Sequence, residues 1–273
     1  MARASLKVRI ATLLTDFGTN GPYAAAMKGA ILRRYPLARL VDISHDIPAH
    51  DVLTAAFVLA QAAPQFPPGT VHVVVVDPGV GTQRRIMAAT FGEQTFLFPD
   101  NGVITFVAET MPLERIVVVR NTKYLPPADP SATFHGRDIF APIAGHVLGG
   151  VDIDRLGPQP ETYKLLEVPT PAVQGDALVG QVIYVDTFGN LVSNITDNAL
   201  VQTHPALDRV RVFCAGRDVG PLQGAYGFVD QGRPLAIVNS MGRIEVAINR
   251  GRACDALDAG LGTEIRVQEA KSA

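Results

Sequence analysis

The stretch VVVVDPGVGTQRR, residues 73–85, decides the fold of the first half of the chain. It completes an apolar run over 70–77 that ends on Asp77 and enters a turn rich in glycine. A strand that is apolar at every position is typical of a parallel sheet whose two faces are both covered. Ligands of such sheets bind beyond the carboxyl ends of the strands, so Asp77 lies where its carboxylate can contact a ligand.

Strand-like and helix-like segments alternate around this stretch. The apolar spacing and the positions of proline and glycine predict strands, helices and one hairpin. The strands are expected at 8–16, 38–44 and 70–77, the helices at 20–36, 49–66, 104–110 and 136–150, and the hairpin at 85–102. This alternation predicts an α/β fold with a largely parallel sheet.

The second half of the chain has a different pattern. Segments rich in β-formers are separated by glycine turns, and they lie at 180–190, 209–216, 235–251 and 263–268. This pattern predicts a small β-sandwich or β-barrel. The proline-containing stretch 166–174 is interpreted as the linker, which gives an N-terminal α/β domain at 1–165 and a C-terminal β domain at 166–273.

The composition restricts the class of protein. Of 273 residues, 47% are hydrophobic and 18% charged, which is enough apolar material for a packed core. The formal net charge of -2 argues against a broad nucleic-acid surface, which needs a basic face. No apolar run approaches the ~18 residues of a membrane span, and the N-terminal run is too short for a signal segment. We therefore expect a cytoplasmic protein without nucleic-acid or membrane partners, in which Cys214 and Cys254 are small apolar residues.

The glycine turn after Asp77 has two further interpretations. GVGTQR, residues 79–84, lacks the third glycine of the dinucleotide-binding fingerprint, and no acidic residue follows at the required distance. A nicotinamide or flavin cofactor is therefore not expected. The plainer interpretation is a tight turn in which glycines adopt unusual φ and Asp77 serves as a cap.

Polar residues at other strand ends favour a functional interpretation. Asp16 ends the first predicted strand, and SHD at 44–46 ends the second. Carboxyl ends of parallel strands meet at one edge, so these groups and Asp77 are expected to lie close together. TFHGRD, residues 133–138, adds His135 in a loop before a helix, and with Arg84 it becomes a candidate member of one polar cluster.

Two other motifs admit a structural interpretation beside a functional one. SHDIPAHD offers His45, Asp46, His50 and Asp51 as metal ligands, although Asp51 stands where a helix cap is favoured. PDNG at 99–102 is most simply a turn. In the second half, Phe188 of segment 186–194 could stack on a ring, and Asn190 could form hydrogen bonds with the edge of a base. This segment and segment 238–251 are also compatible with ordinary β-hairpins.

Taken together, these motifs resemble a known family, the S-adenosyl-L-methionine (SAM) hydroxide adenosyltransferases, whose relatives include SAM-dependent fluorinases and chlorinases. The resemblance rests on LLTDFG (13–18), DISHDI (42–47), VVDPGVGTQRR (75–85), FPDNG (98–102), TFHGRD (133–138), DTFGNLVSNI (186–195) and NSMGRIEVAINRG (239–251). It implies an N-terminal α/β domain, a C-terminal β-barrel and a homotrimer, with SAM between the N-terminal domain of one subunit and the C-terminal domain of the next.

The resemblance also implies a reaction and its residues. Water or hydroxide attacks the 5′ carbon of the ribose and displaces L-methionine, which leaves adenosine. The family's water-activating triad falls on Asp77, Arg84 and His135, and the aspartate that holds both ribose hydroxyls falls on Asp16. Halogenating relatives carry an aromatic residue at the Asp77 position and replace His135, so this chain resembles the members that use water.

The remaining positions implied by the resemblance lie in the second half. The asparagine beside adenine falls on Asn190, with Asp186 and Phe188 near it. The serine that helps to hold the methionine end falls on Ser240. Fluorinases have an arginine after that serine, and this chain has Met241 there, so the resemblance leaves the partner of the methionine carboxylate open.

Three alternatives remain beside SAM hydrolysis. A SAM-dependent halogenase shares the family, a metal-dependent hydrolase of nucleosides or phosphoesters would use SHDIPAHD and HGRD, and a non-catalytic module would bind SAM or adenosine without turnover. The preferred interpretation needs no cofactor and no metal, because SAM itself is the substrate and the reaction is largely a matter of positioning.

Overall fold

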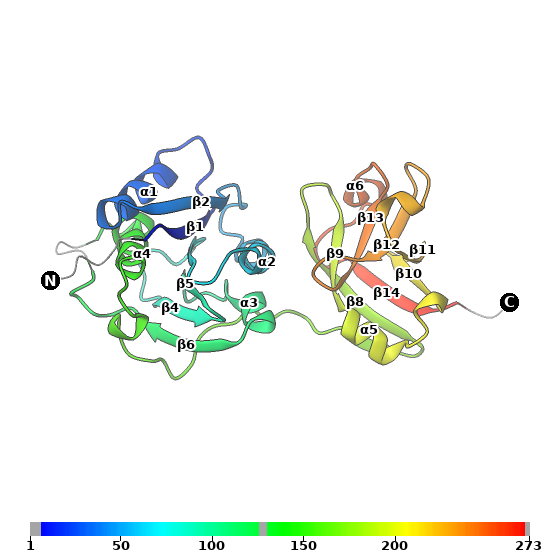
Figure 1. The fold of residues 1–273 in the computed structure, drawn as a ribbon. Coiled ribbons are helices and arrows are strands. Elements are labelled where there is room, and N and C mark those ends of the chain that lie inside the picture. Colours follow the sequence, from blue (N-terminus) through cyan, green and yellow to red (C-terminus); the bar gives the residue numbers. More distant parts are fainter. Residues whose placement is uncertain (1–6, 126–129, 271–273) are drawn as a thin grey trace. The chain divides into compact units, whose positions relative to one another are not determined.

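The computed structural model describes residues 7–125 and 130–270, and the chain divides into two compact units, Met1–Leu166 and Glu167–Ala273 (Figure 1). Residues 1–6, on which part of the signal-segment argument rests, lie outside the described residues. In the described part of the chain, no helix has the length and apolarity needed to cross a membrane.

Unit 1 is built on a six-stranded sheet of order β2-β1-β3-β5-β4-β6. Its strands are β1 (Arg9–Thr15), β2 (Ala38–Ser44), β3 (Val71–Val75), β4 (Ile86–Phe91), β5 (Gln94–Pro99) and β6 (Leu113–Val118). β1 runs parallel to β2 and β3, and β3 runs parallel to β5, whereas β4 is antiparallel to both β5 and β6. The predicted parallel-rich sheet and the predicted hairpin are both confirmed.

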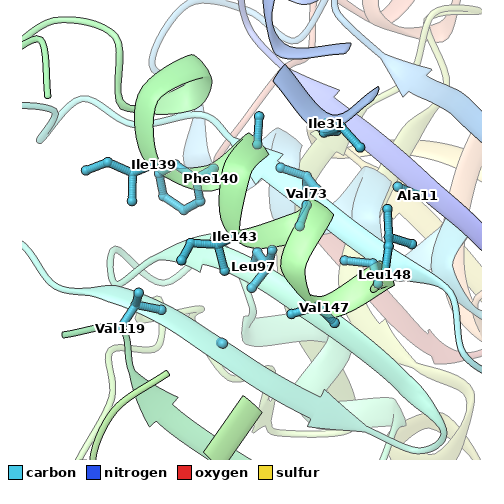
Figure 2. Close-up of a cluster of buried hydrophobic side chains, with 14 of the residues drawn as sticks. Ala11, Ile31, Val73, Leu97, Val119, Ile139, Phe140, Ile143, Val147 and Leu148 are labelled. Carbon is cyan, nitrogen blue, oxygen red and sulfur yellow. The ribbon is translucent and has the colours of Figure 1, made fainter. Parts of the chain in front are cut away.

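Helices cover the sheet on both faces (Figure 1). α1 (Tyr23–Arg34) and α4 (Ala141–Leu148) pack on one face, and α2 (Val52–Ala62) and α3 (Thr105–Thr110) contact each other on the opposite face. Figure 2 shows the first interface, where apolar side chains of α1 and α4 meet those of the central strands. Apolar side chains on both faces of β3 are therefore buried, as its continuous run of valines predicts.

The antiparallel direction of β4 brings two arginines to the carboxyl end of the parallel strands. Asp77 lies just beyond the end of β3, and Asp100 lies just beyond the end of β5. Because β4 runs the opposite way, the residues that precede it, Arg84 and Arg85, lie at the same edge of the sheet. Arg84 pairs with Asp77, and Arg85 pairs with Asp100, so each strand-end carboxylate receives one of two consecutive arginines.

The helix predicted over 136–150 begins in an unusual way. Gly136–Phe140 form one π-helical turn, and α4 starts directly after it. Pro142 lies in the first turn of α4, where its missing N–H removes one possible helical hydrogen bond. Single π-helical turns are frequent at functional sites, and this one is immediately preceded by His135.

Unit 2 is a closed barrel of seven strands. They are β8 (Ala177–Val185), β9 (Leu191–Thr196), β10 (Val210–Cys214), β11 (Arg217–Gln223), β12 (Pro234–Val238), β13 (Arg243–Ile248) and β14 (Glu264–Glu269). Closure is complete because β14 pairs with both β10 and β8, and a short strand, β7 (Ala172–Gln174), adds to β8. Two short helices, α5 (Asp197–Thr203) and α6 (Ala253–Leu257), complete the unit. Of the two predicted β architectures, the structure adopts the barrel.

Candidate active site

A cavity of about 520 Å³ opens at the carboxyl ends of the strands of unit 1. Asp16, which follows β1, and Asp77, which follows β3, both line it, together with His50 and His135. β1 and β3 are neighbours in the sheet, so the residues that follow them lie side by side. The structure therefore brings Asp16 and Asp77 to one cavity, as the sequence predicted, whereas residues 44–46, which were predicted to join them, do not line it.

Asp77, Arg84 and His135 form a continuous chain of hydrogen bonds. Arg84 Nε donates to both carboxylate oxygens of Asp77, at 2.9 Å to Oδ1 and 2.7 Å to Oδ2, and its Nη2 also contacts Oδ2. The same Nη2 lies 2.8 Å from Nδ1 of His135. The side chains of Asp77 and Arg84 are only 3% and 7% exposed, so this contact is shielded from water and from salt.

The hydrogen bond from Arg84 fixes the protonation state of His135. A guanidinium can only donate, so Nδ1 of His135 must accept, which requires the neutral ring with its proton on Nε2. Burial, followed by the positive charge of Arg84, lowers the pKa of His135 below its ordinary value of 6.5, against the opposing charge of Asp77. In the neutral state the remaining ring nitrogen, Nε2, is a hydrogen-bond donor and not a base.

Asp16 lines the same cavity from the end of the neighbouring strand β1. Its Oδ2 accepts a hydrogen bond from the backbone amide of His50 at 2.9 Å. His50 adopts φ of +67°, a left-handed conformation that is uncommon for residues other than glycine. The sequence analysis considered His50 only as a metal ligand, whereas the structure uses its backbone to orient Asp16.

The four groups of SHDIPAHD do not converge. His45 is buried, with Nδ1 at 2.8 Å from Thr15 Oγ1, and Asp51 caps α2 by accepting from the amide of Thr54 at 2.9 Å. Asp46 is exposed. Over residues 7–125 and 130–270, no group of three or more His, Cys, Asp or Glu side chains is arranged to hold a metal ion. The helix-cap interpretation of Asp51 is therefore the one that the structure supports.

An aromatic wall, which sequence reasoning missed, lines the cavity. Phe17, Tyr23 and Phe134 pack against one another with ring centroids 5.2–5.7 Å apart. The guanidinium carbon of Arg137 lies 5.0 Å from the centroid of the Phe134 ring. A signal was present, because Phe17 and Phe134 are direct neighbours of Asp16 and His135 in two of the quoted motifs.

Unit 2 has a cavity of its own, of about 620 Å³, around the turn between β8 and β9. Asp186, Phe188 and Asn190 line it, together with Tyr226. Asp186 accepts from the backbone amide of Asn190 at 2.8 Å and from its Nδ2 at 2.9 Å, which leaves the side-chain oxygen of Asn190 as the group that can meet a ligand. Phe188 is 74% exposed, so the ring is presented to solvent or to a binding partner.

Ser240 is not among the residues that line this cavity. It is exposed in the turn between β12 and β13, where Asn239 Oδ1 accepts from the backbone amides of Met241 and Arg243 at 3.0 and 3.1 Å. The amide of Met241 is thus engaged within the turn. The predicted role of Ser240 stays a prediction.

Comparison with known proteins agrees with this architecture. Residues 11–157 match the family profile of the SAM hydroxide adenosyltransferase N-terminal domain, and residues 180–266 match that of the C-terminal domain. The chain is similar to a solved structure described as an uncharacterized conserved protein from Thermotoga maritima, with a TM-score of 0.87 and 37% identity, covering 95% of this chain and 100% of that one.

Curated relatives cover most of the chain. A protein of Thermus thermophilus named (R)-S-adenosyl-L-methionine hydrolase is 37% identical over 93% of this chain and 97% of its own length. A protein of Salinispora arenicola with the same name is 40% identical over 93% and 95%. A protein of Actinoplanes sp. named fluorinase is 27% identical over 88% and 91%. The resemblance found in the sequence is confirmed, and the chain belongs to the SAM hydroxide adenosyltransferase family.

Proposed function

We propose that the protein hydrolyses SAM to adenosine and L-methionine. The observation that carries this proposal is the chain of hydrogen bonds from Asp77 through Arg84 to His135, at a cavity that Asp16 also lines. Relatives 37% and 40% identical over nearly the whole chain are named for hydrolysis of (R)-SAM. The fluorinase-named relative is less similar, and a buried carboxylate beside the attacking atom would repel a halide.

The reaction is a single displacement at the ribose 5′ carbon. A water oxygen forms a bond to C5′ while the bond from C5′ to the sulfonium sulfur breaks, and the electron pair of that bond stays on sulfur. Methionine therefore leaves as a neutral thioether, and one proton of the water must be taken up. Holding water, carbon and sulfur in line is the main task of the protein.

Asp77 is the member of the triad that we assign to the water proton. Arg84 cannot accept a proton, and the hydrogen bond from Arg84 to Nδ1 leaves His135 with a donor at Nε2. Arg84 orients the Asp77 carboxylate by donating to both of its oxygens, while His135 Nε2 can donate to the water oxygen and so orient the water. Together they favour a hydroxide-like water at one position in the cavity.

We propose that the cavity of unit 1 and the cavity of unit 2 each hold part of the substrate. In unit 1, Asp16 accepts from the two ribose hydroxyls. In unit 2, Phe188 stacks on adenine, and the side-chain oxygen of Asn190 accepts from the amino group of adenine. Asp186 orients Asn190 by accepting from its Nδ2. Ser240 helps to bind the methionine part of SAM. We propose that the protein is cytoplasmic, as its composition led us to expect, and that it forms the homotrimer that the resemblance implies. Unit 1 of one copy and unit 2 of another would then bind the same SAM molecule.

The decisive test is incubation of the purified protein with SAM alone. Each sulfur epimer is assayed separately, because the name of the relatives specifies the (R) form. We expect adenosine and L-methionine in equal amounts, in buffer free of halide and containing a strong chelator. If 5′-chloro-5′-deoxyadenosine is the main product when chloride is added, the protein is a halogenase. If activity appears only after metal is added, the result favours the metal-dependent hydrolase. If SAM binds without turnover, the protein is a non-catalytic module.

The dependence of kcat/KM on pH tests the assigned state of His135. Protonation of its ring at low pH would remove the acceptor for Arg84 and break the triad. Because the pKa of His135 is lowered below 6.5, we expect kcat/KM to stay level from neutral pH to about 6.5 and to fall only in more acidic buffer. Thermal melting at each pH separates this loss from unfolding. A fall centred above pH 6.5 would contradict the neutral assignment.

A further inference from the structure

Glu245, in β13 of unit 2, is a buried carboxylate that the proposed reaction does not use. It is 4% exposed, and burial raises its pKa above the ordinary value. Its Oε1 accepts from the hydroxyl of Tyr226 at 2.7 Å, and its Oε2 accepts from Nδ2 of Asn239 at 3.1 Å. Burying a carboxylate costs free energy unless its oxygens are satisfied, so an apolar side chain would be the simpler choice for packing alone.

Its two partners belong to different segments. Tyr226 begins the short helical turn Tyr226–Phe228 and lines the 620 Å³ cavity beside Phe188 and Asn190. Asn239 opens the turn between β12 and β13, and its Oδ1 is the acceptor for two backbone amides of that turn. One carboxylate therefore joins Tyr226, at the cavity of unit 2, to the turn between β12 and β13 that contains Ser240.

We propose that Glu245 is a positioning residue for SAM: it sets the separation between Tyr226 and the turn that begins at Asn239, so that both meet the substrate without rearrangement. This inference rests on the proposed function. Glu245 reaches the substrate only through Tyr226 and Asn239, so it shapes binding and takes no part in the chemical step. Without it, the Tyr226 hydroxyl and the Asn239 side-chain amide lose their acceptor, and the two segments are free to separate.

A carboxamide at this position should preserve the arrangement. Asn239 is fixed in orientation because its oxygen already accepts from the amides of Met241 and Arg243, so it must present Nδ2 to residue 245. A glutamine can turn its oxygen toward that Nδ2 and its amino group toward the Tyr226 oxygen, which can accept. Glu245→Gln therefore retains both links, whereas Glu245→Ala removes both.

The experiment measures KM and kcat for SAM, the dissociation constant for adenosine, and the melting temperature of each variant. For Glu245→Ala we expect KM to rise about tenfold, the scale of a lost hydrogen bond in a buried position, with kcat within about threefold of the parent. Glu245→Gln should stay within about threefold in both. Glu264→Ala, which removes an exposed glutamate of strand β14 elsewhere in the barrel, should behave as the parent.

A mutant cycle tests the link directly. Tyr226→Phe should raise KM in the parent and have little further effect in Glu245→Ala, because the hydroxyl acts through the missing carboxylate. Fully additive effects would overturn the proposal, and so would a parental KM and adenosine affinity in a folded Glu245→Ala. A parent that binds adenosine but does not hydrolyse SAM would instead refute the proposed function, while its adenosine affinities would still decide the role of Glu245.

Discussion

Asp77→Asn is expected to lower kcat for SAM hydrolysis by about 10²-fold or more, the usual scale for loss of an acid–base group. The substitution keeps the size of the side chain but replaces one acceptor oxygen with an amino group, which can neither take the water proton nor accept from Arg84. SAM affinity should stay near that of the parent, because the ribose is assigned to Asp16. The measurement is kcat and KM per folded molecule, with the melting temperature taken on the same preparation.

Asp100→Asn is the matched control for this prediction. Asp100 is equally buried, follows the neighbouring strand β5 and pairs with Arg85, but it does not line the cavity. It also accepts from the backbone amide of Lys164 at 2.8 Å, which is a structural contact. We expect Asp100→Asn to lower the melting temperature and to leave turnover per folded molecule intact. If Asp77→Asn shows that same pattern, Asp77 is a turn residue and the assignment of the water proton is wrong.

Asp16→Ala is expected to weaken adenosine binding by about 10²-fold or more, because two charge-assisted hydrogen bonds to the ribose hydroxyls, worth roughly 1.5–3 kcal/mol each, are lost. The effect should appear mainly in KM for SAM and in the adenosine dissociation constant measured by calorimetry. The value of kcat at saturating SAM should change much less, since Asp16 is assigned to the ribose and not to the attacking water.

Asp16→Asn separates ribose binding from loop structure. Its side-chain oxygen can still accept from the amide of His50, so the loop before α2 should stay in place. Its amino group cannot accept from a ribose hydroxyl, so adenosine binding should still be weakened. Parental adenosine affinity in both variants would mean that Asp16 only orders the backbone around His50.

The sequence predicted best where local pattern and burial agree. The valine run of β3 and the alternating helices of unit 1 were predicted in the right places, because apolar periodicity directly reflects which faces are covered. β6 was missed, since Leu113–Val118 begins with three exposed residues and lacks a clear alternation. The short helices α5 and α6 were also missed, because five to seven residues give too little periodicity to outweigh the surrounding β pattern.

The sequence predicted which residues form the site, but it did not predict the hydrogen bonds between them. Strand ends and motif spacing indicated Asp16 and Asp77, whereas the acceptor state of His135 depends on an arginine 51 residues away and could not be derived from spacing. The role of the His50 backbone was hidden for a similar reason, because a side-chain pattern carries no information about which amide turns toward Asp16.

The reversed direction of β4 also determines how the triad is assembled during folding. Asp77 and Arg84 are seven residues apart, and Arg84 and His135 are 51 apart. Closing the longer loop costs about 2 kcal/mol more conformational entropy for a flexible chain. The ion pair is therefore a local structure that a partly folded chain can keep, whereas the histidine arrives only when the π-helical turn and α4 dock on the sheet. Loosening α4 is thus expected to abolish catalysis before it abolishes the Asp77–Arg84 pair.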